Sequence, residues 1–78
     1  MTFAIIWHPA ARHILLKLPI RTATLVDRAV ICFAELGEGQ VEWVAPYHRL
    51  RAGPYDVALS VEGETCVINV LDVYRARP

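Results

Sequence analysis

The sequence predicts an α+β domain in which a helical hairpin packs on one face of a small, mostly antiparallel sheet, in the order β-α-α-β-β-β. Two observations support this prediction. Apolar side chains recur at steps of three and four over residues 9–36, whereas from residue 47 onward they alternate with polar ones. A chain of 78 residues suits one domain, so we expect residues 1–78 to fold as a single unit.

The first half of the chain is predicted to form one strand and two helices. TFAIIW, residues 2–7, is rich in β-forming residues and is expected to be a strand buried on both faces. Pro9 suits the first turn of a helix over residues 9–18. A second helix, over residues 21–36, has Thr22 as its expected cap, ends at Gly37, and presents one apolar face made of Leu25, Ala29, Cys32, Phe33 and Leu36.

The second half is predicted to form three strands joined by tight turns. YHRLR, residues 47–51, alternates, and GP then turns the chain into YDVALSVE, residues 55–62. EGET, residues 62–65, is expected to be a turn in which Gly63 takes a positive φ. CVINVLDV, residues 66–73, then returns as an antiparallel partner.

Composition limits the classes of function. Apolar residues make up 55% of the chain, so we expect spare apolar surface that meets a partner protein, a second copy of the chain or a flexible peptide. Eight basic residues balance eight acidic ones, so a nucleic-acid role must rest on local clusters of charge. No apolar run approaches the roughly 18 residues of a membrane span. Without a signal peptide, the expected location is cytoplasmic.

Cysteines and histidines give no sign of a metal site. No C-x-x-C or H-E-x-x-H spacing occurs, so we predict neither a metal nor another cofactor. Cys32 and Cys66 lie inside apolar runs and are expected to be buried thiols. Trp7 and Trp43 are expected in the core, although aromatic rings can also stack on bases.

Basic residues form two pairs in the second half, within YHRLRAGPYDVALSVEGETCVINVLDVYRAR, residues 47–77. This stretch resembles the RelE/ParE superfamily of toxins from bacterial type II toxin–antitoxin pairs. In that superfamily the second half commonly reads Y-R-L-R-V-G-x-Y-R-V-x-Y, a hairpin turn, then V-x-V-L-x-V-x-x-R. The resemblance implies a RelE-like fold, a cognate antitoxin as partner and a role in plasmid stabilization.

In the ribonuclease branch, the resemblance further implies metal-independent cleavage of mRNA on the ribosome, with arginines stabilising the phosphate. It carries the catalytic role to Arg49, Arg51, Arg75 and Tyr74, with His48 as an alternative for proton transfer. The same resemblance implies RNA binding by Arg49, Arg51, Arg75, Arg77 and His48. The plain alternative is that these arginines form only the solvated rim of a sheet.

Three features oppose catalysis. Asp56 stands where the superfamily usually has arginine, the chain stops at Pro78 without a C-terminal tyrosine or helix, and the net charge is zero. The sequence therefore leaves three hypotheses open. The chain is a RelE-like toxin with weakened or lost cleavage, a non-catalytic binder, or a small domain without toxicity. The non-catalytic binder would be a ParE-like inhibitor of DNA gyrase or a degenerate antitoxin-binding protein.

Overall fold

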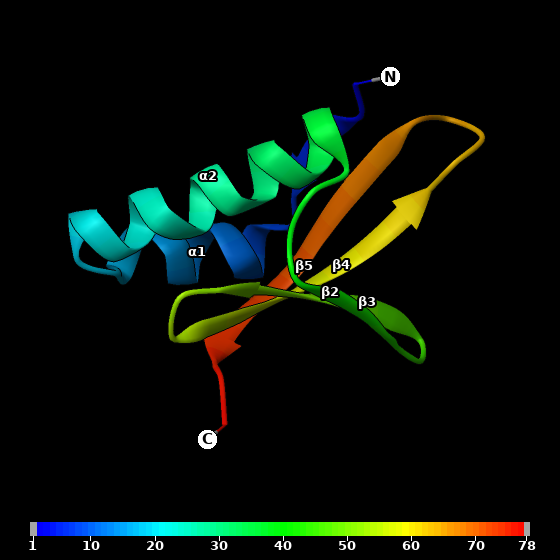
Figure 1. The fold of residues 1–78 in the computed structure, drawn as a ribbon. Coiled ribbons are helices and arrows are strands. Elements are labelled where there is room, and N and C mark those ends of the chain that lie inside the picture. The colour runs from blue at the N-terminus through cyan, green and yellow to red at the C-terminus, as the bar shows by residue number, and fades with distance from the viewer. Residues whose placement is uncertain (1, 78) are drawn as a thin grey trace.

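The computed structural model describes residues 2–77 and contains two helices and five strands in that part of the chain (Figure 1). In chain order these elements are β1 (Ala4–Trp7), α1 (Pro9–Lys17), α2 (Ile20–Leu36), β2 (Val41–Val44), β3 (Tyr47–Ala52), β4 (Tyr55–Glu62) and β5 (Val67–Arg75). The strands form one sheet in the order β1-β5-β4-β3-β2, and only the β1–β5 pair is parallel. The predicted α+β fold is confirmed, and β2 is a further strand.

Both helices form where their sequences favour them. Pro9 opens α1, and the Ala10 N–H donates to Nδ1 of His8, the residue that caps this helix. α2 ends at Gly37, whose φ of 68° is left-handed and whose N–H donates to the Phe33 carbonyl. The predicted cap at Thr22 is wrong. The cap position is Pro19, which fixes φ for the start of a helix at Ile20, so Thr22 already lies inside the first turn.

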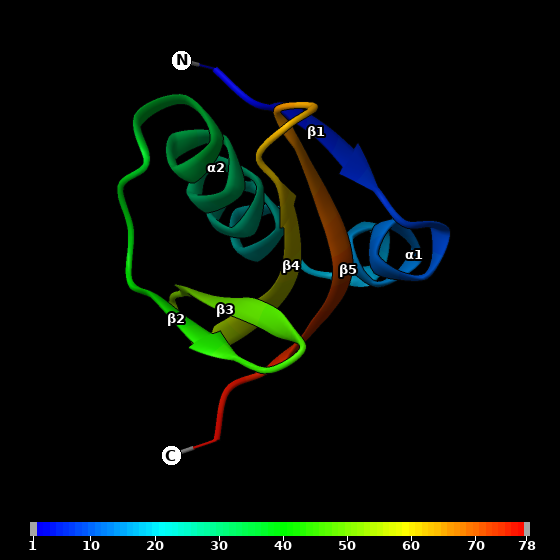
Figure 2. The same ribbon diagram turned by 90° about the vertical axis from the view of Figure 1, so that its right-hand side faces the viewer.

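The core lies between the two helices and one face of the sheet. α1 packs against β5 and α2 packs against β3 and β1, and in Figure 2 α2 lies on the β4 side and α1 on the β5 side of the β4–β5 pair. α2 buries Val26, Val30 and Ala34. Of the face predicted for it, Ala29 and Phe33 are half-buried and pack against this core, whereas Leu25 and Leu36 are 44% and 66% exposed. The helix is apolar around most of its circumference, so periodicity alone allowed more than one buried face. The strands contribute Leu50, Val57, Leu59, Ile68, Val70 and Val73.

The two sheet edges are less buried than the sequence suggested. β1 was predicted to be buried on both faces, but Ala4 and Ile6 are exposed and only Ile5 and Trp7 face the core. This strand is the last in the sheet, so the helices cover one face only. Trp43 lies on the opposite edge strand and is 62% exposed, which corrects its predicted place in the core.

The turn between β4 and β5 differs from its prediction. Cys66, and not Gly63, adopts the positive φ, at 54°. The side chain of Cys66 is half-buried because it belongs to the turn that precedes β5, and Cys32 is half-buried on α2. The prediction that both thiols are fully buried is therefore wrong, and neither forms a disulfide. Over the described chain, neither helix has the length and apolar character needed to cross a membrane.

Candidate nucleic-acid interface on the open face of the sheet

Strand alternation divides the sheet into a core face and an open face. Leu50 and Val57 point into the core, so their strand neighbours Arg49, Arg51 and Asp56 point away from the helices. Arg51 lies directly opposite Asp56. Tyr74 on β5 pairs with Asp56 from the other side, so it faces the same way. The sheet thus brings together three of the residues predicted from the sequence.

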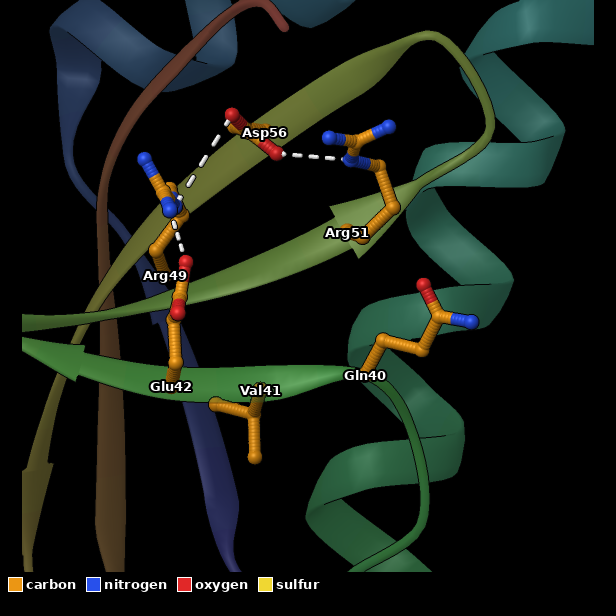
Figure 3. A pocket seen from close by; sticks show the side chains of 6 residues that line it. All are labelled: Gln40, Val41, Glu42, Arg49, Arg51 and Asp56. Atoms are coloured by element: carbon orange, nitrogen blue, oxygen red, sulfur yellow. Dashed lines mark hydrogen bonds and ion pairs between the residues drawn. The ribbon is translucent and has the colours of Figure 1, made fainter.

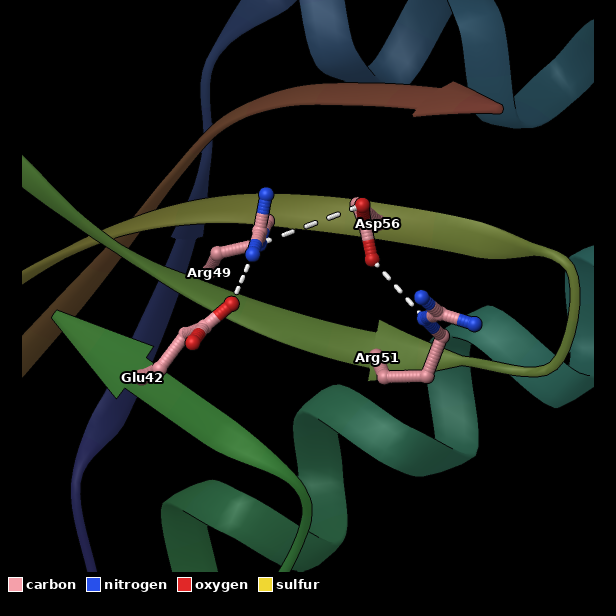
Figure 4. A network of polar contacts seen from close by, with 4 residues as sticks. All are labelled: Glu42, Arg49, Arg51 and Asp56. Atoms are coloured by element: carbon pink, nitrogen blue, oxygen red, sulfur yellow. Dashed lines mark hydrogen bonds and ion pairs between the residues drawn. The ribbon is translucent and has the colours of Figure 1, made fainter. Parts of the chain in front are cut away.

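A polar network links the side chains of this open face (Figure 4). The Nε of Arg51 donates to Oδ1 of Asp56 at 3.0 Å. The Nε of Arg49 lies 4.0 Å from the other oxygen of Asp56, and its Nη2 donates to Oε1 of Glu42. Glu42 reaches Arg49 because β2 and β3 pair these two residues directly. Two arginines and two carboxylates therefore form one chain of ion pairs with no net charge.

The network lines an open cavity of about 280 Å³ between the ends of β2, β3 and β4 (Figure 3). Its walls are the side chains of Gln40, Val41, Glu42, Arg49, Arg51 and Asp56. Asp56 is buried, with a side chain 6% exposed, whereas the Glu42 side chain is 59% exposed. Within residues 2–77, Arg51 contacts Asp56 through Nε alone, so its two terminal nitrogens remain available to an anion.

The surroundings of Tyr74 on this face change its proton affinity. Burial raises the pKa of Tyr74 above its ordinary value of 10.0. A hydrogen bond with Tyr47 and the negative charge of Asp56 act in the same direction, and the positive charge of Arg49 opposes them. Tyr74 is therefore protonated at neutral pH, which suits a proton donor and not a base.

The other predicted residues lie elsewhere. Arg75 follows Tyr74 on β5, so it points to the opposite face, where its guanidinium carbon lies 6.0 Å from the centre of the Tyr55 ring. Arg77 is exposed beyond the end of β5. His48 turns toward the core side of β3, with its ring centre 4.9 Å from that of Trp43 and its Nδ1 buried without a hydrogen-bond partner among the described residues.

Sequence reasoning missed Gln40, Glu42 and Tyr47. Glu42 lies on β2, a strand that was not predicted from the sequence. The alternation in VEWV, residues 41–44, was the available signal. Residues 2–77 contain no group of three histidine, cysteine or acidic side chains that could hold a metal ion.

A second surface lies beside the helices and is apolar. It forms a groove of about 510 Å³ lined by Trp7, Arg12, Leu15, Leu16, Leu18, Ile20, Ala23, Thr24 and Asp27. Leu16 and Ile20, at the turn between α1 and α2, are 73% and 83% exposed. One positive and one negative side chain therefore flank an apolar floor, an arrangement typical of sites that bind an amphipathic segment.

Comparison with known proteins identifies the fold. The archaeal RelE in complex with RelB from Pyrococcus horikoshii superposes with a TM-score of 0.80 at 21% identity, over 96% of each chain. The chain has the RelE fold. The RelBE2 toxin–antitoxin complex from Mycobacterium tuberculosis gives a TM-score of 0.71 at 22% identity, over 97% of this chain and 100% of that one.

A third structure extends this agreement. Free E. coli RelE, carrying two arginine-to-alanine changes, gives a TM-score of 0.78 at 17% identity, over 99% of this chain and 86% of that one. No protein-family model matches the chain, and no curated protein matches its sequence. The RelE fold confirms the architecture expected from residues 47–77.

Proposed function

We propose that this chain is the toxin of a bacterial type II toxin–antitoxin pair and that a cognate antitoxin binds it. The RelE fold supports this, as does the fact that the P. horikoshii and M. tuberculosis neighbours are complexes of toxin and antitoxin. The apolar groove beside α1 and α2 supplies a surface that an amphipathic antitoxin segment can cover. Its most exposed members, Leu16 and Ile20, would be buried by such a segment.

We infer further that the toxin acts in the cytoplasm on translation, by cleaving mRNA on the ribosome. The observation that carries this inference is that Arg49, Arg51 and Tyr74 converge on one open face around Asp56. Attack of a ribose 2′-hydroxyl on the neighbouring phosphate leaves a 2′,3′-cyclic phosphate and a 5′-hydroxyl. The arginines would stabilise the added negative charge, and Tyr74 would donate the proton that the leaving 5′-oxygen needs. The proton of the 2′-hydroxyl would pass to solvent water, from which Tyr74 would regain the proton it gave up.

The acidic residues of the same face weaken this activity in our proposal. Glu42 and Asp56 already neutralise the two arginines, so less positive charge remains for the transition state. Removing a single preorganised donor from a comparable site lowers kcat by about 10²–10³. We therefore expect slow cleavage compared with an enzyme whose arginines are unpaired.

The same neutralised network favours a second candidate, a protein that binds its antitoxin but has lost cleavage. Such a protein would act through protein contacts alone, either on DNA gyrase or on the antitoxin. Zero net charge in the Glu42, Arg49, Arg51 and Asp56 network is the observation that supports this alternative. Interaction with RNA gains affinity by releasing counterions, and a neutral surface gains little from that release.

The deciding experiment is induced expression in a bacterial host without antitoxin. We expect the wild type to slow growth, the Arg49→Ala/Arg51→Ala variant to relieve the effect, and Arg28→Ala, an exposed arginine on α2, to behave as the wild type. Transcripts ending in 2′,3′-cyclic phosphate would support cleavage. A DNA-damage response with filamentation would point to gyrase, and normal growth with the wild type would contradict both kinds of toxin.

A further inference from the structure

The two carboxylates of the open face contact the arginines in different ways. Asp56 sits on β4, inside the sheet, and its side chain is 6% exposed. It faces the Nε of both arginines, at 3.0 Å from Arg51 and 4.0 Å from Arg49. Nε is the inner nitrogen of a guanidinium group, next to the aliphatic stem. Asp56 therefore faces the Nε atom of each arginine and leaves their terminal Nη nitrogens available to other partners.

Glu42 takes one of those terminal nitrogens. It lies on the edge strand β2, and its carboxylate accepts from Nη2 of Arg49 (Figure 4). The side chain is 59% exposed, so solvent or a ligand can reach it. Nη2 lies beside Nε on one edge of the guanidinium group, so a phosphate oxygen that binds this edge of Arg49 meets the Glu42 carboxylate there. Glu42 and a phosphate therefore compete for one position.

The energies favour exchange at Glu42 and not at Asp56. An exposed ion pair contributes only about 0–1 kcal/mol, so a phosphodiester can displace Glu42 at little cost. Displacing Asp56 would leave a buried carboxylate without its partners, which is far less favourable. Gln40 lines the same cavity and can donate to a bound anion through its amide.

We propose that the cavity lined by β2, β3 and β4 on the open face is a phosphodiester-binding subsite, that Glu42 occupies it when RNA is absent, and that Asp56 positions the arginines of this subsite. RNA binding exchanges the Glu42 carboxylate for a backbone phosphate on Arg49. Arg51 contributes its two terminal nitrogens without having to give up Asp56. This inference rests on the proposed action on RNA and adds an internal competitor to that site.

The test is binding of a fluorescently labelled single-stranded RNA oligonucleotide, followed by anisotropy at an ionic strength of about 0.1 M, where the Debye length is about 10 Å. Glu42→Gln keeps the shape of the side chain and removes the competing charge. We expect a two- to five-fold lower Kd, equivalent to about 0.4–1 kcal/mol at 1.4 kcal/mol per tenfold. The gain should disappear at high salt, because screening weakens an exposed pair.

Two controls separate competition from a general effect of charge. Glu64→Gln changes the net charge equally but lies in the exposed turn between β4 and β5, more than about 13 Å from Arg49, because Arg49 pairs with Ala58 and β4 continues to Glu62 at about 3.3 Å per strand residue. It should leave the Kd within about 1.5-fold of the wild type, since a distant exposed charge is screened.

The second control is Glu42→Gln in an Arg49→Ala background, where the gain in RNA affinity should vanish because the shared nitrogen is gone.

Several outcomes would overturn the inference. These are an equal gain from Glu64→Gln, a gain that persists without Arg49, or no gain from Glu42→Gln. Inorganic phosphate is a further arm: at millimolar concentration it should compete with RNA more effectively for the Glu42→Gln variant than for the wild type. Equal competition for both proteins would contradict a shared phosphate position.

Failure of the inference can be told apart from failure of the proposed function. If Arg49→Ala/Arg51→Ala relieves toxicity and weakens RNA binding while Glu42→Gln changes nothing, the arginine face acts on RNA but Glu42 does not compete there. If neither the wild type nor any variant binds RNA, the proposed action on RNA and the competition both fail.

Discussion

Removing Arg51 should reveal how strongly the fold depends on the ion pairs around Asp56. In Arg51→Ala, Oδ1 of Asp56 loses its donor at 3.0 Å, and Arg49 remains 4.0 Å from the other oxygen. Breaking a fully buried pair costs about 3–5 kcal/mol. Arg51 is 47% exposed and Arg49 stays nearby, so we expect the free energy of unfolding to fall by about 1–3 kcal/mol. For a domain of this size the Tm should drop by about 4–8 °C per kcal/mol.

Urea denaturation followed by tryptophan fluorescence measures this loss, with Arg28→Ala as the matched exposed-arginine control. Adding Asp56→Asn to Arg51→Ala should recover part of the stability, because an unpaired amide is cheaper to bury than an unpaired carboxylate. The reasoning would be refuted if Arg51→Ala stayed within about 0.5 kcal/mol of the control, or if the second change gave no recovery.

Three further predictions concern the fold, the tyrosine and the groove. Gly53→Ala should destabilise the protein by more than about 1 kcal/mol, and by more than Gly37→Ala does. Both glycines have a positive φ, but only at Gly53 would an added Cβ clash with the Leu25 side chain. Equal losses of stability in urea denaturation would contradict this. The raised pKa of Tyr74 means that the folded protein holds this proton more tightly, so its contribution is complete below about pH 10 and is lost as pH rises through the folded pKa. Unfolding titrations above pH 10 should therefore show a steeper loss in the wild type than in Tyr74→Phe, and parallel slopes would count against the assignment. Leu16→Glu/Ile20→Glu, at two highly exposed positions, should leave the Tm nearly unchanged but reduce co-purification with the co-expressed antitoxin, and undiminished co-purification would remove the groove from the interface.

The sequence predicted the elements whose signals are local. Pro9 and Gly37 mark a helix start and a helix end through their own backbone preferences, and the alternation of residues 55–62 predicted β4. Arg49 and Arg51 were correctly placed on a shared face, because two residues on alternate strand positions must point the same way.

Local sequence patterns did not predict the features that depend on contacts between residues far apart in the chain. The exposure of Ile6 depends on β1 being an edge strand, which only the complete strand order decides. The pairing of Glu42 with Arg49 depends on β2, a strand of four residues whose short alternation gives a weak signal. Asp56 was expected to oppose catalysis, and its contacts with the Nε atoms of two arginines emerged only from side-chain geometry.

The parallel pairing of β1 with β5 also bears on how this protein is made. Ala4 pairs with Val67, so neighbours in the sheet are separated by most of the chain. β5 lies between β1 and β4 and supplies the buried Val70 and Val73, yet it is the last of the seven elements to be synthesised. A nascent chain whose β5 is still inside the ribosome cannot form the complete sheet that carries Arg49 and Arg51. The open face that carries Arg49 and Arg51 is therefore complete only after β5 has left the ribosome.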